Sequence, residues 1–132
     1  MSSIEGEGWE RVGVAAALAK QYADDEREFL SLLAAFIESA LPNEATVERR
    51  GWFGKKTISR VVVSLGEFNY MIEDPGRGPL EARRARVVRG VALKTEQLGV
   101  PEWIELLSAT LDQRASTSQA TREALSRLLG ES

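Results

Sequence analysis

The sequence contains no cysteine and no histidine among its 132 residues. Without cysteine the chain can form neither a disulfide nor a thiolate zinc site, and without histidine it lacks the commonest general base. A cysteine nucleophile and a Ser-His-Asp triad are excluded for the same reason. An enzyme built on this chain would have to use Asp, Glu, Lys, Tyr or a metal held by carboxylates. We therefore expect a protein that is not an enzyme and that holds neither a cofactor nor a metal.

Long apolar runs and an export signal are also missing. No stretch approaches the roughly 18 uninterrupted apolar residues of a membrane span. The first ten residues hold three Glu and no basic residue, whereas a secretory signal begins with basic residues. These absences predict a cytoplasmic protein without a membrane span. The length is typical of one domain, so we expect a single α+β domain over 1–132 with disordered ends at 1–8 and 130–132.

The net charge of −3 hides a segregation along the chain. Residues 1–45 carry a net charge of −6, residues 46–95 carry +6, and residues 96–132 carry −3. A basic middle between acidic ends raises the possibility of nucleic-acid binding, and it also offers a surface for an acidic protein partner. The overall acidity and the lack of a known nucleic-acid motif favour the protein partner.

The clearest helix lies at residues 25–41. Its apolar positions follow the 3.6-residue period of one helix face: Phe29, Leu32, Leu33, Phe36, Ile37, Ala40 and Leu41. Either Asp24 or Asp25 can cap the start of this helix, and Asp25 with Glu28 resembles a capping box. Pro42 ends the helix. The preceding segment, 9–22, is also helical in character. Two interpretations remain open here: a break at 23–25, or one long helix.

A β-hairpin is predicted around Gly66-Glu67, which fits the type II′ turn of a two-residue loop. This register pairs Leu65 with Phe68, Val63 with Tyr70 and Val61 with Ile72 on one face. The opposite face carries Arg60, Val62, Ser64, Asn69, Met71 and Glu73. A strand at 46–50 precedes the strand 58–65, and the two are joined by the loop 51–54.

The second half of the chain predicts two more strands and a helix. The strands are 80–88 and 91–97, with a break at Arg89-Gly90. Pro101 suits the first position of the last helix, whose apolar stripe includes Ile104, Leu107 and Leu111 and resumes at Leu125, Leu128 and Leu129. The expected fold is therefore α+β and two-layered: a single antiparallel sheet of four to five strands, flanked by N-terminal and C-terminal helices, with one sheet face open.

The tip of the first hairpin is one candidate binding element. It gathers two aromatic side chains and four cations within eight residues: Arg49, Arg50, Trp52, Phe53, Lys55 and Lys56. Aromatics in an exposed loop can anchor a partner, and the cations can steer an acidic one. Alternatively, the aromatics fold back onto a helix end and the cations form a solvated rim. Both interpretations remain open from the sequence.

A run of arginines is the second candidate: Arg83, Arg84, Arg86 and Arg89. Together with the tip cations it could form a continuous basic surface for phosphates. The other interpretation is that these arginines pair with the acidic helices of the same chain, or only keep it soluble. We favour the second interpretation.

One part of the sequence resembles known proteins: the segment 82–96, ARRARVVRGVALKTE, followed by Pro101-Glu102-Trp103. Over residues 24–111 the chain resembles small uncharacterised bacterial proteins of helix–sheet–helix layout, which implies that fold and no particular activity. Its acidic pI, size and α-then-β order are also similar to those of type III secretion chaperones. Such chaperones carry their dimer helix between the third and fourth strands, and this chain has no obvious helix there.

These observations favour a non-enzymatic protein-interaction module, such as an adaptor, a chaperone-like protein or an immunity-type binder. The expected partner is another protein that is acidic at the contact, and a homodimer is also expected because the sheet has open edges. The alternative is a nucleic-acid-binding domain that uses the basic segment 46–95.

Overall fold

The computed structural model describes residues 15–52, 54–115 and 119–130. Helix 15–24 is followed by α2 (Glu26–Ala40) and then by five strands. The strands are β1 (Ala45–Trp52), β2 (Lys55–Leu65), β3 (Phe68–Glu73), β4 (Glu81–Val88) and β5 (Val91–Leu98). Two helices close the described part: α3 (Val100–Ala115) and α4 (Gln119–Leu128). The expected disordered ends, 1–8 and 130–132, lie outside the described residues except for Gly130.

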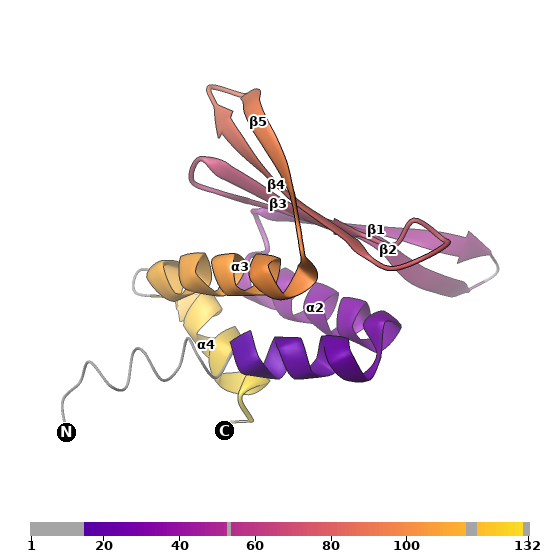
Figure 1. The fold of residues 1–132 in the computed structure, drawn as a ribbon. Helices are drawn as coiled ribbons and strands as arrows, with labels where there is room; N and C mark the ends of the chain where they lie inside the picture. Colours follow the sequence, from indigo (N-terminus) through magenta and orange to yellow (C-terminus); the bar gives the residue numbers. More distant parts are fainter. Residues whose placement is uncertain (1–14, 53, 116–118, 131–132) are drawn as a thin grey trace.

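The five strands form one antiparallel sheet in the order β1-β2-β3-β4-β5, so each strand pairs with its neighbours in sequence. The helices pack on one face of this sheet (Figure 1). This arrangement confirms the predicted α+β fold with a single antiparallel sheet and two layers. No strand of the described part pairs with the outer edge of β1 or of β5, so both edges are open.

The chain breaks between helix 15–24 and α2 at Asp25, which decides between the two predictions for this region. Asp25 has extended backbone angles, and its Oδ1 accepts hydrogen bonds from Arg27 N–H at 3.0 Å and Glu28 N–H at 3.1 Å. These bonds satisfy two of the donors that a helix start leaves unpaired. At the other end, Leu41 N–H donates to Ile37 O, and Pro42 follows outside the helix.

The central β2–β3 hairpin has the predicted register. Leu65 pairs with Phe68, and the ladder continues through the Val63–Tyr70 and Val61–Ile72 pairs. Gly66 has a φ of 59°, which a residue with a Cβ adopts only at a cost, so glycine suits the turn. Because the side chains alternate, this register sends one set of residues to the helix layer and the other set to the open face.

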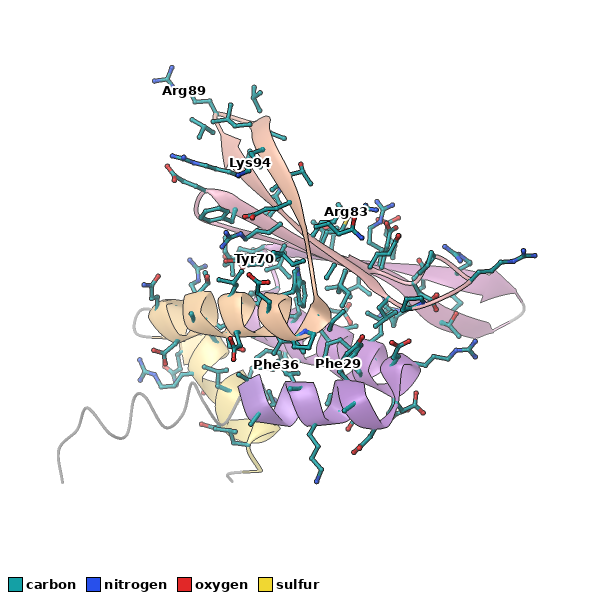
Figure 2. All side chains as sticks on the ribbon, in the orientation of Figure 1. Phe29, Phe36, Tyr70, Arg83, Arg89 and Lys94 are labelled. Carbon is teal, nitrogen blue, oxygen red and sulfur yellow. The ribbon has the colours of Figure 1, made fainter. Side chains whose placement is uncertain are left out.

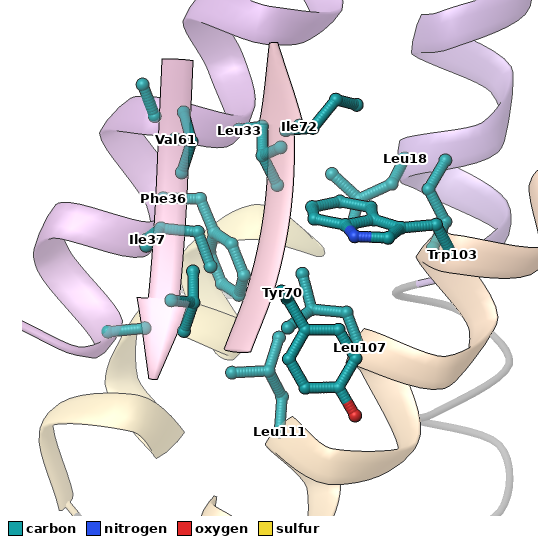
Figure 3. Close-up of a cluster of buried hydrophobic side chains, with 14 of the residues drawn as sticks. Leu18, Leu33, Phe36, Ile37, Val61, Tyr70, Ile72, Trp103, Leu107 and Leu111 are labelled. Atoms are coloured by element: carbon teal, nitrogen blue, oxygen red, sulfur yellow. The ribbon is translucent and has the colours of Figure 1, made fainter. Parts of the chain in front are cut away.

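The core lies between the helix-facing side of the sheet and the helices. Phe29 and Phe36 come from α2, and both are buried (Figure 2). Tyr70 of β3 packs edge-on against Trp103 of α3, with ring centroids 6.3 Å apart, and Leu107 lies beside them (Figure 3). Burying each such large side chain stabilises the fold by about 1.5–3 kcal/mol. The core therefore joins α2 and α3 through the sheet.

Two predicted boundaries are wrong in detail. β2 begins at Lys55, because the ladder with β1 extends to the Trp52–Lys55 pair and shortens the loop predicted at 51–54. Pro101 is the second residue of α3, since the helix begins at Val100 and Gly99 O accepts the first bond from Trp103 N–H at 3.0 Å. Residues 116–118, between α3 and α4, lie outside the described part of the chain.

Candidate interaction surface

The tip of the β1–β2 hairpin is only partly described. Arg49 turns toward α2, where its Nη2 lies 3.0 Å from Glu38 Oε1. Arg50 lies beside Gly76 in the loop after β3, since a Cβ built there would be 3.4 Å from Arg50 Nη1. Lys56 is exposed. The other predicted members lie outside the described part, Phe53 as a whole and Trp52 and Lys55 in their side chains. The tip as a binding element therefore stays a prediction.

Three arginines of the predicted run form ion pairs within the sheet. Arg83 lies 3.2 Å from Glu73, Arg84 lies 2.8 Å from Glu96, and Arg86 lies 3.6 Å from Glu67, measured between nitrogen and oxygen atoms. The partners come from strands and from the β2–β3 turn. The prediction that the acidic helices supply them is therefore wrong for these three residues. Sequence order could not reveal this, since the strand register decides which charges meet.

The open face of the sheet carries a ladder of alternating charges, which we call the ion ladder. It runs across β1, β2, β3 and β4 through Glu48, Arg60, Glu73, Arg83 and Glu81, with nitrogen–oxygen distances of 3.2 to 3.6 Å. All five side chains are partly exposed, so each pair adds at most about 1 kcal/mol of stability. The ladder pairs two arginines of the basic segment 46–95 with three glutamates of the same segment.

Arg84 lies on the opposite, helix-facing side of β4. Its guanidinium packs over the Phe68 ring, 4.4 Å from the centroid, and it bonds Glu96 on β5. The bond to Glu96 raises the pKa of Arg84, and the same bond lowers the pKa of the Glu96 carboxyl. Arg84 therefore fastens β3, β4 and β5 together and holds Glu96 as an ion.

The far end of the β4–β5 hairpin extends beyond the helix layer (Figure 1). We define residues 86–97 as the β4–β5 arm. The two large apolar side chains that are exposed in the described part of the chain both lie on it: Val91 at 59% and Leu93 at 60% exposure. Exposed cations surround them, namely Arg86, Arg89 and Lys94; the last two are labelled in Figure 2. The arm is thus an apolar patch with a positive rim.

The backbone of the arm contains a tight turn at its tip and a bulge in β5. Arg89 has a φ of 53° and Gly90 a φ of 80°, which is the pattern of a type I′ turn. Arg86 pairs with Lys94 while Val87 pairs with Ala92, so Leu93 is an extra residue in β5 and forms a bulge. Bulges re-aim the side chains of an edge strand, and this one sets the exposed position of Leu93.

Sequence reasoning identified Arg86 and Arg89 but missed Val91 and Leu93. Their signal is the apolar run Val91-Ala92-Leu93, which alone does not differ from a buried strand. The strand order shows that this apolar run is exposed, because β5 is an edge strand and no helix covers its far end. The β5 residues from Val91 to Thr95 are all exposed.

Two hollows lie elsewhere on the surface. A cleft of about 500 Å³ opens between the β2–β3 turn and α3, and its lining includes Phe68, Tyr70 and Thr110. The Tyr70 and Thr110 hydroxyls bond each other at 2.8 Å. An apolar groove of about 260 Å³ lies between α2 and α4. Across the described residues, no three acidic side chains gather closely enough to hold a metal ion.

Comparisons with protein-family models, curated proteins and solved structures found no match to this chain. In the part of the chain that the structure describes, no helix has the length and apolar character to cross a membrane. The surface chemistry of the chain itself, above all that of the β4–β5 arm, is therefore what indicates a function.

Proposed function

We propose that this chain is a non-enzymatic protein-interaction module whose contact surface is the β4–β5 arm. The observation that carries the proposal is the exposure of Val91 and Leu93 on an edge strand. Isolated exposed apolar residues are ordinary, but a pair on an unpaired strand edge is a typical docking feature. The expected partner presents an apolar contact with acidic residues around it.

The charges of the arm support an acidic partner. Arg89 and Lys94 have no carboxylate within ion-pair distance among the described residues, and Arg86 shares Glu67 at the long distance of 3.6 Å. Such rim cations chiefly accelerate the encounter with an acidic surface, while buried apolar contacts supply most of the affinity. The arm combines both kinds of group on one hairpin.

The placement of the remaining cations speaks against the alternative function of nucleic-acid binding. A nucleic-acid backbone is usually followed by a continuous stripe of Lys and Arg. Here Arg60, Arg83 and Arg84 are paired with carboxylates. The arm and the β1–β2 tip lie at opposite ends of the sheet, so their cations form no continuous stripe (Figure 1).

Site-specific photo-crosslinking in the native host tests the proposal. A photoreactive amino acid replaces Leu93 on the arm, and in a matched control it replaces Ser31, an exposed residue of α2. We expect a discrete adduct from position 93, identifiable by mass spectrometry, and none at comparable yield from position 31. Equal yields at both positions, or no adduct from position 93, would overturn the proposal.

A further inference from the structure

We propose that one partner of the arm is a second copy of the same chain. In this arrangement β5 of one copy pairs antiparallel with β5 of the other about a two-fold axis at Thr95, which joins the two sheets into one. The inference rests on the proposed function in one respect: it takes the arm to be an interaction surface. It adds the identity of a partner, the register and the side chains that select it.

The hydrogen-bond pattern of the sheet shows which backbone groups of β5 are available. Bonded and non-bonded residue pairs alternate along an antiparallel ladder. Val87 N–H donates to Glu67 O at 2.6 Å, so Val87 turns its backbone groups toward β3. By alternation Arg84 turns its groups toward β5, and Glu96, its partner there, turns inward to meet them. Thr95 therefore points its N–H and C=O outward.

Gln97 follows the same alternation and also points its backbone groups to the open edge. A second strand can pair with β5 only through such outward groups. A two-fold axis at Thr95 places the Thr95 residues of the two copies opposite each other, so each Thr95 N–H can donate to the other copy's Thr95 carbonyl. The backbone thus permits this register without rearrangement of the β4–β5 ladder.

Side-chain charge selects this register from its neighbours. With the axis at Thr95, Lys94 of one copy lies opposite Glu96 of the other, and symmetry repeats the pair. An axis at Glu96 would place two carboxylates opposite each other, and an axis at Lys94 would place two ammonium groups opposite each other. Like charges directly opposite on adjacent strands are destabilising, while opposite charges are stabilising. The charge pattern of β5 is therefore complementary to itself in one register.

The β4 residues next to Lys94 and Glu96 make this charge complementarity stronger. Lys94 pairs with Arg86 across β4 and β5, and Glu67 is the carboxylate within ion-pair distance of that row. The row therefore carries an excess positive charge at the edge. Glu96 is held as an ion by Arg84, which lowers the pKa of the Glu96 carboxyl. A second copy supplies a stable negative charge at the position where the first copy has an unbalanced positive one.

The same register also covers the exposed apolar residues. It places Leu93 opposite Gln97 of the other copy and Val91 opposite Gly99, so the added strand removes both side chains from water in part. A competing role for Lys94 and the bulge at Leu93 is to protect the edge from any strand pairing, as natural edge strands often do. If Lys94 and the bulge protect the edge, the wild type stays monomeric. If the charges of β5 select a partner strand, the wild type dimerises.

Charge exchange is the decisive test, read by sedimentation velocity across a dilution series. The wild type should sediment as a dimer of twice 14.5 kDa at the higher concentrations. Lys94→Glu and Glu96→Lys should each weaken self-association by roughly tenfold or more, because each turns two attractive cross-strand pairs into repulsive ones. A mixture of the two single variants should form a heterodimer, since both pairs are then attractive again.

A backbone variant provides an independent arm of the test. Thr95→Pro removes the outward N–H that pairs the two copies, whereas the bonds from β5 to β4 do not use it. We expect Thr95→Pro to be monomeric with a melting temperature near that of the wild type. Thr95→Val, which keeps the N–H, should still dimerise. Circular dichroism of every variant confirms that the fold is kept.

The results separate this inference from the proposed function. A wild type that stays monomeric at all concentrations, a mixture of the charge variants that does not associate, or a dimer that survives Thr95→Pro overturns the β5 pairing. If a different host protein is still crosslinked from position 93 in that case, the proposed function stands without the self-pairing. If the crosslinked product is the dimer and depends on Lys94 and Glu96, both proposals hold.

Discussion

Trp103 of α3 donates a hydrogen bond from its Nε1 to the backbone oxygen of Arg83 on β4, at 3.1 Å. The indole is fully buried, so this bond satisfies a donor that would otherwise be unpaired in the core. The same Arg83 sends its side chain to the other face of the sheet, where it joins the ion ladder. One residue of β4 thus links the core to the open face.

Replacement of that indole tests the strength of the link. Trp103→Phe keeps an aromatic ring but removes the donor and part of the volume. We expect a loss of about 1–3 kcal/mol in the free energy of unfolding from the missing bond, plus a contribution from the cavity. Urea denaturation measures it. A stability equal to that of the wild type would mean that the bond contributes nothing.

The two faces of β2 should respond differently to a buried charge. Val63 is fully buried on the helix-facing side, while its neighbour Val62 is partly exposed on the open face. Val63→Asp should cost roughly 3 kcal/mol or more, because it buries an unpaired carboxylate, and Val62→Asp should cost much less. Thermal unfolding compares them. Equal losses would contradict a sheet that is open on one side.

The Arg84–Glu96 ion pair should make stability depend on pH in a known direction. The pKa of Glu96 is lowered in the folded state by its bond to Arg84. A lowered folded-state pKa gives stability that is present above the unfolded value and is lost as the pH falls through the folded value. The stability difference between wild type and Glu96→Gln should therefore be constant near neutral pH and shrink below the ordinary value of 4.5.

Glu105 provides the matched control for that measurement, because it is an exposed carboxylate of α3. Glu105→Gln should show a smaller change in stability than Glu96→Gln across the same pH range. Denaturation in urea at a series of pH values gives both differences. If the two differences follow the same course with pH, the bond to Arg84 has no special part in the pH dependence.

The central hairpin could be predicted from sequence because several local signals agree there. Gly66 suits the turn, and the alternation of Val61, Val63 and Leu65 fixes which face is buried. The helix α2 could be predicted for a similar reason, since its apolar period, the Asp25 cap and Pro42 all indicate the same bounds. A local prediction is reliable where the turn residues, the apolar periodicity and the capping residues all indicate the same structure.

The exposed apolar patch of the arm could not be predicted, because the exposure of its residues depends on the strand order. Arg84 interrupts the alternation of β4, and only the structure explains it, since its side chain packs on Phe68 on the inner face. The exposure of Val91 and Leu93 follows from the position of β5 at the edge and from the bulge. Neither property can be read from periodicity, which is the same in edge and central strands.

The exposed Leu93 of the arm should matter for association and not for folding. Leu93→Thr introduces a β-branched residue that suits a strand, while it removes most of the apolar side chain from the patch. Because Leu93 is 60% exposed, the substitution should change the free energy of unfolding of the monomer by no more than about 0.5 kcal/mol. Leu107→Thr, at a fully buried position of α3, should instead cost several kcal/mol, as large losses in a packed core do.

The same variant should weaken association through the arm, because the apolar contact supplies affinity that the rim charges do not. We expect a larger dissociation constant for Leu93→Thr in sedimentation experiments and a lower yield of adducts from a photoreactive group placed at Val91. A Leu93→Thr variant that is clearly less stable than the wild type would show that Leu93 belongs to the core. An unchanged dissociation constant and adduct yield would remove the apolar patch from the contact surface.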